Sequence, residues 1–158
     1  MKFNQATDYA FRMIVHMSML PVGTKKTGGE LARAECIPER FLLKIMRSLI
    51  HAKIMKSYRG VEGGFALQRE PKDITLLDVV VAVEGDAYLQ KCLYDVDSCS
   101  RGCQGHCALH ECIGAIQTKL IEMLESENFA TLAMREKKIR SELHICGDST
   151  QYAAEQVV

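Results

Sequence analysis

The chain has 158 residues, of which 47% are hydrophobic and 25% are charged, a composition that excludes disordered and collagen-like proteins. This length suits one domain with a core of its own, or such a domain with an appendage. No apolar run approaches the roughly 20 residues that a membrane span requires, and the N-terminus lacks a small-residue cleavage site. We therefore expect a cytoplasmic protein.

The net charge of zero conceals two halves of opposite sign. Residues 1–72 hold 13 lysines and arginines against 6 acidic residues, a net charge of +7, whereas residues 73–158 hold 7 against 14, a net charge of −7. A basic half of this size favours a phosphate-rich partner that contacts one end of the molecule. A chance imbalance of solvated faces is the alternative, and charge alone leaves it open.

Three helices are predicted in the basic half. The first is expected to begin after Thr7 as N-cap, the second begins at Thr27, and the third has Pro38 in its first turn. The apolar residues that fall at helical spacing in the first and third helices are Ala10, Met13, Ile14, Met17, Phe41, Leu42, Ile45, Met46 and Leu49.

A β-hairpin is predicted after the third helix. Residues 54–58 and 65–68 resemble two short strands, and the glycine-rich stretch 59–64 between them supplies the positive φ angles that a tight turn needs. Three helices followed by a hairpin predict a winged helix-turn-helix. In that fold the third helix enters the major groove of DNA, and the hairpin reaches the backbone or the minor groove.

The third helix carries the candidate DNA-binding residues. Arg40, Lys44 and Arg47 lie at i, i+4 and i+7, so they share one edge of the helix. Arginine pairs with guanine, lysine contacts guanine or neutralises phosphate, and Arg59 at the wing tip suits a narrow minor groove. Leu43 lies near the same edge and either touches a thymine methyl group or belongs to the core. The alternative for the whole face is a solvated helix on a protein-interaction module.

The acidic half predicts three more helices. One runs from Thr75 to Glu84, with a capping-box arrangement at Thr75 and Asp78 and a stop at Gly85. A longer one runs from about Leu109 to Glu125, and residues 128–143 form the last. An apolar stripe on the longer helix favours either a two-fold dimer or packing within the chain. Its members are Ile113, Ile116, Leu120, Met123 and Leu124.

Seven cysteines are too many for chance in a cytosolic chain. Five of them crowd into 21 residues, namely Cys92, Cys99, Cys103, Cys107 and Cys112. In a reducing compartment such a group indicates metal ligands or a redox switch. The irregular spacings do not match the paired knuckles of a zinc ribbon and favour an iron–sulfur cluster, although zinc stays an alternative. His110 follows Cys107 by three residues, so both can face one site.

Taken together, these features resemble the IscR/NsrR family of bacterial iron–sulfur transcriptional regulators. The segments that carry the resemblance are 7–10 (TDYA), 37–42 (IPERFL), 57–65 (SYRGVEGGF), 74–85 (ITLLDVVVAVEG) and the cysteine loop. They cover roughly residues 1–125. The resemblance implies a homodimer with a winged helix on each subunit, a long crossing dimerisation helix, and a cluster held by three cysteines near that helix.

The resemblance also implies the cluster ligands, which we assign to Cys92, Cys99 and Cys107. IscR-like members carry a 2Fe–2S cluster with a histidine three residues after the last cysteine, which here is His110. NsrR-like members carry a 4Fe–4S cluster with an aspartate from the other subunit, which here is Asp8. An acidic residue in the first turn of a helix also favours the helix dipole without any metal.

The chain departs from the family pattern in the cysteine loop and in the wing. Seven residues separate Cys99 from Cys107 where the family commonly has five, and Cys103 lies between them. Cys103 either replaces one of the ligands or acts as a second thiol that responds to oxidants. Cys112 is expected to behave as a small hydrophobe in the dimer helix, and Cys36 and Cys146 have no assigned role. The wing has Val-Glu at 61–62 where many relatives have Pro-Gly.

We therefore expect a mainly α-helical fold with a small β wing, in which a winged helix-turn-helix precedes a long dimerisation helix. The predicted parts are a DNA-binding domain (1–85), a cluster-binding loop (86–108), the dimerisation helix with the helix after it (109–145), and a polar tail (146–158).

The predicted function is a homodimeric, sequence-specific transcriptional regulator that senses iron, redox state or nitric oxide through the cluster. The alternative is a zinc- or thiol-switch regulator without a cluster. Promoter DNA, a second copy of the chain and the cluster-assembly machinery are the expected partners, with no membrane. No nucleophile–base signature, phosphate loop or paired carboxylates are present, so we do not expect an enzyme.

Overall fold

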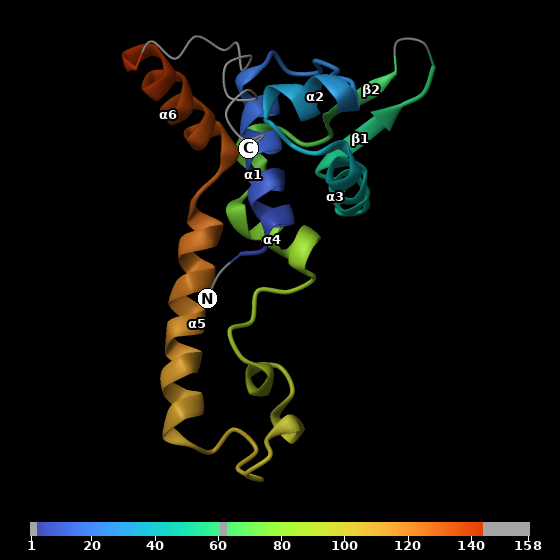
Figure 1. The fold of residues 1–158 in the computed structure, drawn as a ribbon. Coiled ribbons are helices and arrows are strands. Elements are labelled where there is room, and N and C mark those ends of the chain that lie inside the picture. The colour runs from blue at the N-terminus through green and yellow to red at the C-terminus, as the bar shows by residue number, and fades with distance from the viewer. Residues whose placement is uncertain (1–2, 61–62, 144–158) are drawn as a thin grey trace, which may run out of the picture.

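The computed structural model describes residues 3–60 and 63–143 (Figure 1). The fold is mainly helical and contains one two-stranded antiparallel sheet, in agreement with the predicted fold class. The main elements in chain order are α1 (Gln5–Met19), α2 (Gly28–Ala34), α3 (Glu39–His51), β1 (Met55–Tyr58), β2 (Gly64–Leu67), α4 (Leu76–Glu84), α5 (Ala108–Ser126) and α6 (Phe129–Glu142). Short 3-10 helices occur at η1 (Pro71–Asp73), η2 (Lys91–Leu93) and η3 (Val96–Ser98).

The first helix begins one turn earlier than the sequence predicts. Asn4 is the N-cap of α1, because its side-chain oxygen accepts a hydrogen bond from the Thr7 backbone N–H at 2.9 Å. Thr7 lies inside the helix and is fully buried, so its prediction as the cap was wrong. The predicted apolar face of α1 is confirmed, since Ala10, Met13, Ile14 and Met17 are all buried.

Helices α2 and α4 begin with capping boxes. Thr27 and Glu30 bond reciprocally at the start of α2, and these bonds lower the pKa of Glu30 from 4.5 to about 2, chiefly through the Thr27 backbone N–H. The predicted box at Thr75 and Asp78 is present, and Gly85 ends α4 with a φ of +93° that favours glycine. Both boxes satisfy N–H groups that a helix terminus leaves without partners.

The hairpin is anchored to the segment between α1 and α2. Ser57 of β1 pairs with Phe65 of β2, and the backbone of Phe65 also exchanges two hydrogen bonds with Lys26 at 2.7 and 2.9 Å. A Cβ at Gly64 would lie 2.7 Å from the carbonyl oxygen of Lys26, so the close approach requires glycine there. The wing therefore has a fixed base on the helical domain.

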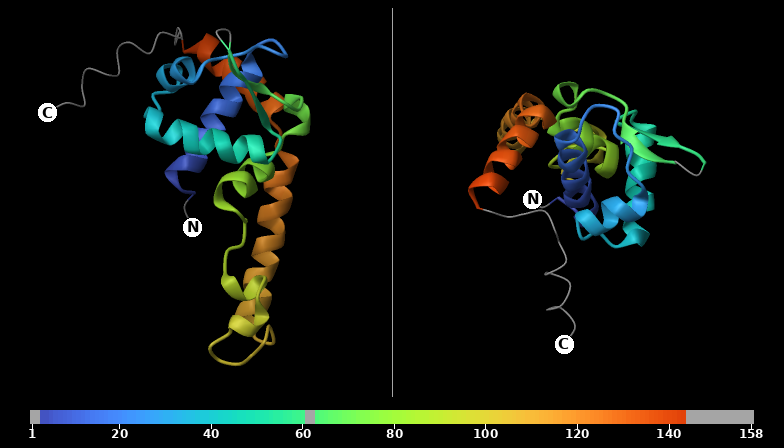
Figure 2. Two further views of the ribbon diagram at one scale, coloured as in Figure 1. Left: turned by 90° about the vertical axis from the view of Figure 1, so that its right-hand side faces the viewer. Right: turned by 90° about the horizontal axis from the view of Figure 1, so that it is seen from above.

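One hydrophobic core joins the N-terminal helices to the last helix. After α5 the chain returns, and α6 packs against α1 (Figures 1 and 2), with Phe129 completely buried and its ring 6.3 Å from that of Phe11. The predicted helix at 128–143 thus contributes to the core of the winged-helix domain. The division of the chain into four parts stays a prediction, and Cys146 and the polar tail lie outside the described residues.

Helix α5 projects away from this core (Figures 1 and 2). Its 19 residues correspond to a length of about 28 Å. The segment between α4 and α5, which we call the cysteine segment (residues 86–107), runs to the far end of α5 and turns back into it (Figure 1). None of the helices in residues 3–60 and 63–143 has both the length and the hydropathy needed to span a membrane.

Candidate nucleic-acid interface and cysteine segment

Helix α3 separates an apolar face from a cationic one. Leu42, Ile45, Met46 and Leu49 are at most 2% exposed and fix the helix against the core. The three predicted contact residues of this helix lie on the opposite, exposed side, as does Leu43; they are Arg40, Lys44 and Arg47. The amphipathic pattern of α3 therefore aims its cations into solvent.

The cations of α3, which is the recognition helix predicted to enter the major groove, and of the wing are free to meet an external anion. Among the described residues, none of Arg40, Lys44, Arg47 and Arg59 forms an ion pair with a carboxylate. Arg40 lies over the ring of Phe41, with its guanidinium carbon 5.2 Å from the ring centre. Neutralising phosphate with such side chains releases counterions, which favours binding to nucleic acid.

The base of the wing carries further cations that sequence analysis did not single out. Lys56 and Lys25 lie 5.5 and 5.2 Å from the centre of the Tyr58 ring, on β1 and on the segment before α2. Arg59 follows Tyr58 directly and is exposed. Residues 61–62, where the sequence departs from the family pattern, lie outside the described residues. The sequence signal for these cations was the occurrence of lysines together with an aromatic residue, Tyr58, in and near the hairpin.

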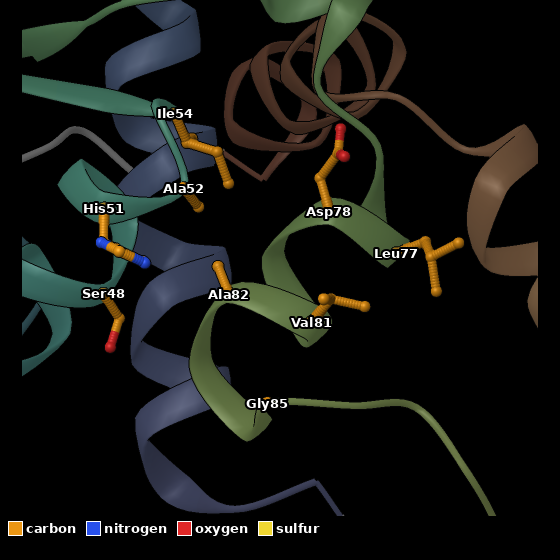
Figure 3. Close-up of a pocket in the computed structure, with 9 residues that line it drawn as sticks. All are labelled: Ser48, His51, Ala52, Ile54, Leu77, Asp78, Val81, Ala82 and Gly85. Atoms are coloured by element: carbon orange, nitrogen blue, oxygen red, sulfur yellow. The ribbon is translucent and has the colours of Figure 1, made fainter. Parts of the chain in front are cut away.

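A pocket lies between the last turn of α3 and helix α4 (Figure 3). Ser48 and His51 line one side of it, and Val81 and Ala82 line the other. The carboxylate in its lining belongs to Asp78, which is already engaged in the α4 capping box and in an ion pair with Arg69 at 3.1 Å. The pocket therefore marks the contact between α3 and α4, and we assign it no chemistry.

The predicted ligand cysteines occupy different local structures in the cysteine segment. Cys92 lies in η2, Cys99 ends η3, and Cys107 is the N-cap of α5. Cys103 lies in the turn between the last two, where Gly102 and Gly105 have φ angles of +67° and +85°. All four of these cysteines are free thiols of intermediate exposure.

Cys99 lies among backbone N–H groups that favour its thiolate. The N–H of Cys103 is the largest cause that lowers the pKa of the Cys99 thiol, followed by the N–H of Arg101; the Gln104 N–H and the Cys103 side chain add to the effect. Burial acts in the opposite direction and is outweighed. A thiol that loses its proton readily is suited both to metal ligation and to oxidation.

Cys107 and His110 are brought together at the start of α5. The sulfur of Cys107 accepts a hydrogen bond from the His110 backbone N–H at 3.4 Å. The Nδ1 atom of His110 is buried and has no hydrogen-bond partner among the described residues. A buried polar atom without a partner is costly. A bound group that pairs with Nδ1 of His110 would remove this cost.

The cysteine thiols are not gathered into a preformed metal site. Within residues 3–60 and 63–143, no three His, Cys, Asp or Glu side chains lie in an arrangement that would hold a metal ion. The donor chemistry fits an iron–sulfur cluster, since the segment offers soft sulfur ligands, a stabilised thiolate at Cys99 and an unpartnered nitrogen at His110. The side chains would have to converge as the cluster binds.

Asp8 lies in the first turn of α1. Its side chain is 57% exposed and forms an ion pair with Arg12 at 2.6 Å. This pair accounts for an acidic residue in the first turn of α1 without any metal. A role of Asp8 as a ligand from the second subunit stays a prediction of the resemblance.

Two polar side chains that sequence analysis missed tie the start of the cysteine segment to the fold. Gln117 of α5 is 5% exposed; its side-chain oxygen accepts from the Leu89 N–H at 2.6 Å, and its amide donates to the Ala87 carbonyl at 2.8 Å. Glu84, just before the segment, accepts from the Asn4 backbone at 3.0 Å and from the Thr7 hydroxyl at 2.6 Å. A lone glutamine in a helix and an exposed glutamate gave no local signal of these partners.

The fold and the cationic recognition helix define a winged-helix DNA-binding regulator. The family model for Rrf2, described as iron-dependent transcriptional regulators, matches residues 3–135, and the chain belongs to this family. The members of this family are regulators and not enzymes.

Curated relatives and solved structures agree with this assignment. The chain is 30% identical over 128 residues to YwgB of Bacillus subtilis (strain 168), which is named as a helix-turn-helix-type transcriptional regulator; the match covers 81% of each chain. It is 24% identical to the NsrR regulator of Shouchella clausii, over 89% of this chain and 94% of that protein. CymR, described as the global cysteine regulator of B. subtilis, has the same fold, with a TM-score of 0.70 at 23% identity over 85% of this chain and 98% of CymR.

Proposed function

We propose that this Rrf2-family transcriptional regulator binds its operator as a homodimer, and that an iron–sulfur cluster in the cysteine segment sets its affinity for DNA. The observation that carries the proposal is the place of the segment in the fold. It begins at the end of α4, which packs in the winged-helix core, and it ends at the N-cap of α5. A change in the conformation of the segment would therefore affect both α4 and α5.

The exposed face of α5 supports the dimer. Leu109, Ile116 and Met123 recur at intervals of seven residues and are 56%, 49% and 69% exposed. A seven-residue apolar repeat on a helix that projects from its domain is the pattern of a helix–helix seam. A second copy of the chain covers such a seam with two-fold symmetry and presents two recognition helices to successive major grooves.

The proposed ligands are the thiolates of Cys92, Cys99 and Cys107, completed by His110 or by Asp8 of the other subunit. When bound, the cluster supplies a centre that responds to iron supply, oxidants or nitric oxide. The chain's own contribution is to deprotonate and orient the thiols: backbone N–H groups favour the thiolate of Cys99, and the first turn of α5 orients Cys107.

Two anchors at the start of the segment supply the route to the DNA-binding domain. Gln117 holds residues 87–89 on α5, and Glu84 holds the start of α1 through Asn4 and Thr7. When the segment becomes more or less ordered, these contacts are strained or released. The relative placement of α5 and the winged helix then changes. A ligand shifts DNA binding only by its different affinity for the two arrangements, so the two forms must bind DNA differently.

The cluster is tested by oxygen-free purification followed by iron and acid-labile sulfide counts. We expect a coloured protein that contains both elements, and loss of both in Cys107→Ser. Cys36→Ser is the matched control, because Cys36 is an exposed thiol in the turn between α2 and α3. A colourless protein with stoichiometric zinc, or one without any metal, would contradict the cluster.

The fourth ligand is tested by comparing Asp8→Ala with His110→Ala. Removal of the true ligand changes the visible spectrum of the anaerobic protein and speeds loss of iron, whereas removal of the other residue leaves both unchanged. Arg12→Ala is the control for Asp8, because it breaks the same ion pair and keeps the carboxylate.

A thiol switch is the second candidate function, and the surroundings of Cys99 favour it. Cys103 lies beside the Cys99 sulfur and lowers its pKa. With peroxide as oxidant, the two thiols lose two protons and two electrons as one S–S bond forms, and the peroxide is reduced to water. For this candidate, metal-free protein changes its DNA affinity on peroxide treatment, and Cys103→Ser abolishes the change.

A further inference from the structure

Helix α3 exposes one large apolar side chain on its cationic side. Leu43 is 57% exposed. Its neighbour Leu42 is 2% exposed, and Met46, one helical turn after Leu42, is 1% exposed. Arg40 precedes Leu43 by three residues and Arg47 follows it by four, so all three lie on adjoining parts of one face. Leu43 thus contributes little to the core and lies among the side chains proposed to meet DNA.

The major groove offers one apolar feature to such a side chain. Guanine, cytosine and adenine present hydrogen-bond donors and acceptors there, and thymine adds the C5-methyl group. We infer that Leu43 is a specificity-determining residue that contacts the C5-methyl group of a thymine in the operator. The inference rests on the proposed approach of α3 to DNA and adds to it the identity of one base.

The spacing along α3 places this thymine relative to the arginine contacts. A rise of about 1.5 Å per residue puts Leu43 about 4.5 Å from Arg40 and about 6 Å from Arg47 along the helix axis. Successive base pairs are about 3.4 Å apart. The thymine is therefore expected within one or two base pairs of a base contacted by Arg40 or Arg47.

The test uses a duplex selected from a random DNA library by the wild-type protein. Each thymine of the selected site is replaced in turn by deoxyuridine, which lacks only the methyl group. We expect one position in each half-site at which wild-type binding weakens about fourfold, the value for one apolar methyl-sized group. Leu43→Ala should bind the thymine and deoxyuridine duplexes equally, and Leu43→Met, which keeps an apolar side chain of similar reach, should retain the preference for thymine.

Leu143→Ala is the matched control, because Leu143 is 62% exposed at the end of α6 and receives the same substitution. This variant should keep the wild-type preference for thymine. The inference is overturned if no deoxyuridine position weakens wild-type binding, or if Leu43→Ala keeps the full preference. Failure to select any duplex, or a selected site unaffected by Arg40→Ala and Arg47→Ala, would instead overturn the approach of α3 to DNA on which the inference rests.

Discussion

The winged-helix core and the cysteine segment differ in how completely the fold determines them. In the core, Met13, Leu49 and Phe129 are fully buried, and helices α2 and α4 begin with capping boxes. The cysteine segment contains two single-turn 3-10 helices, and within the described residues no three of its potential donor side chains lie in an arrangement that would hold a metal ion. Apolar burial and helix caps fix the first region, whereas under our proposal the arrangement of the second depends on the group that its cysteines bind. A region of that kind is suited to act as a sensor.

The largest expected effect comes from breaking the core at its C-terminal contributor. Phe129→Ala should lower the free energy of unfolding by about 3–5 kcal/mol, because it leaves a cavity between α6 and α1. Met134→Ala, at a position 65% exposed on the same helix, should change it by less than about 0.5 kcal/mol. Urea unfolding measures both, and equal effects would mean that α6 does not belong to the core.

A smaller and more local effect is expected where the cysteine segment meets α5. Gln117→Leu leaves the Leu89 N–H and the Ala87 carbonyl without partners, at a local cost of about 1–3 kcal/mol. Hydrogen exchange at the Leu89 amide should therefore become roughly 5- to 150-fold faster while the amides of the core keep their protection. Thr118→Ala, an exposed neighbour on α5, is the control. Unchanged exchange at Leu89 in Gln117→Leu would remove this anchor from the account.

On the recognition helix, Lys44→Ala should weaken DNA binding with little regard to sequence. Loss of one phosphate contact should reduce the slope of log affinity against log salt by about 0.9 and cost roughly fivefold in affinity at physiological salt. Lys137→Ala, an exposed lysine on α6, should change neither quantity. Binding titrations at several salt concentrations measure the slope, and an unchanged slope would place Lys44 away from the backbone.

The smallest effect is expected at the wing. Arg59→Ala should chiefly relax sequence preference, because an arginine in a narrow minor groove favours A·T-rich flanks. Affinities for operators with A·T-rich and G·C-rich flanks should become more similar, with a modest overall loss. A uniform loss on both operators would instead assign Arg59 to the phosphate backbone.

Features that depend on neighbouring residues were predictable from the sequence. The capping box at Thr75 and Asp78, the stop at Gly85 and the cationic edge of α3 all follow from spacings within two turns of a helix. The N-cap of α1 was also within reach of local rules, because asparagine is a preferred cap and Asn4 accepts from the Thr7 N–H three residues on. The sequence could not show that the Thr7 hydroxyl instead bonds to Glu84, 77 residues away in the chain. Side-chain hydrogen bonds across such separations have no local pattern.

Tertiary contacts also determine what the sequence left open in the functional regions. The spacing on α3 placed Leu43 at the boundary of its two faces, and only the packed core shows that this residue is exposed. The cysteines were recognisable as donors by their type and number, whereas the anchor at Gln117 depends on how the segment folds against α5. Local rules identify the chemistry of such a segment and leave its arrangement to tertiary contacts.

The central claim is tested most directly by comparing the operator affinity of cluster-loaded and cluster-free wild-type protein, without oxygen and at one salt concentration. We predict affinities that differ by at least about fivefold, the lower end of typical coupling between two sites. Cys107→Ser should give the cluster-free isotherm under both conditions. Superimposable wild-type isotherms, with full recognition of the operator by the cluster-free form, would contradict the account.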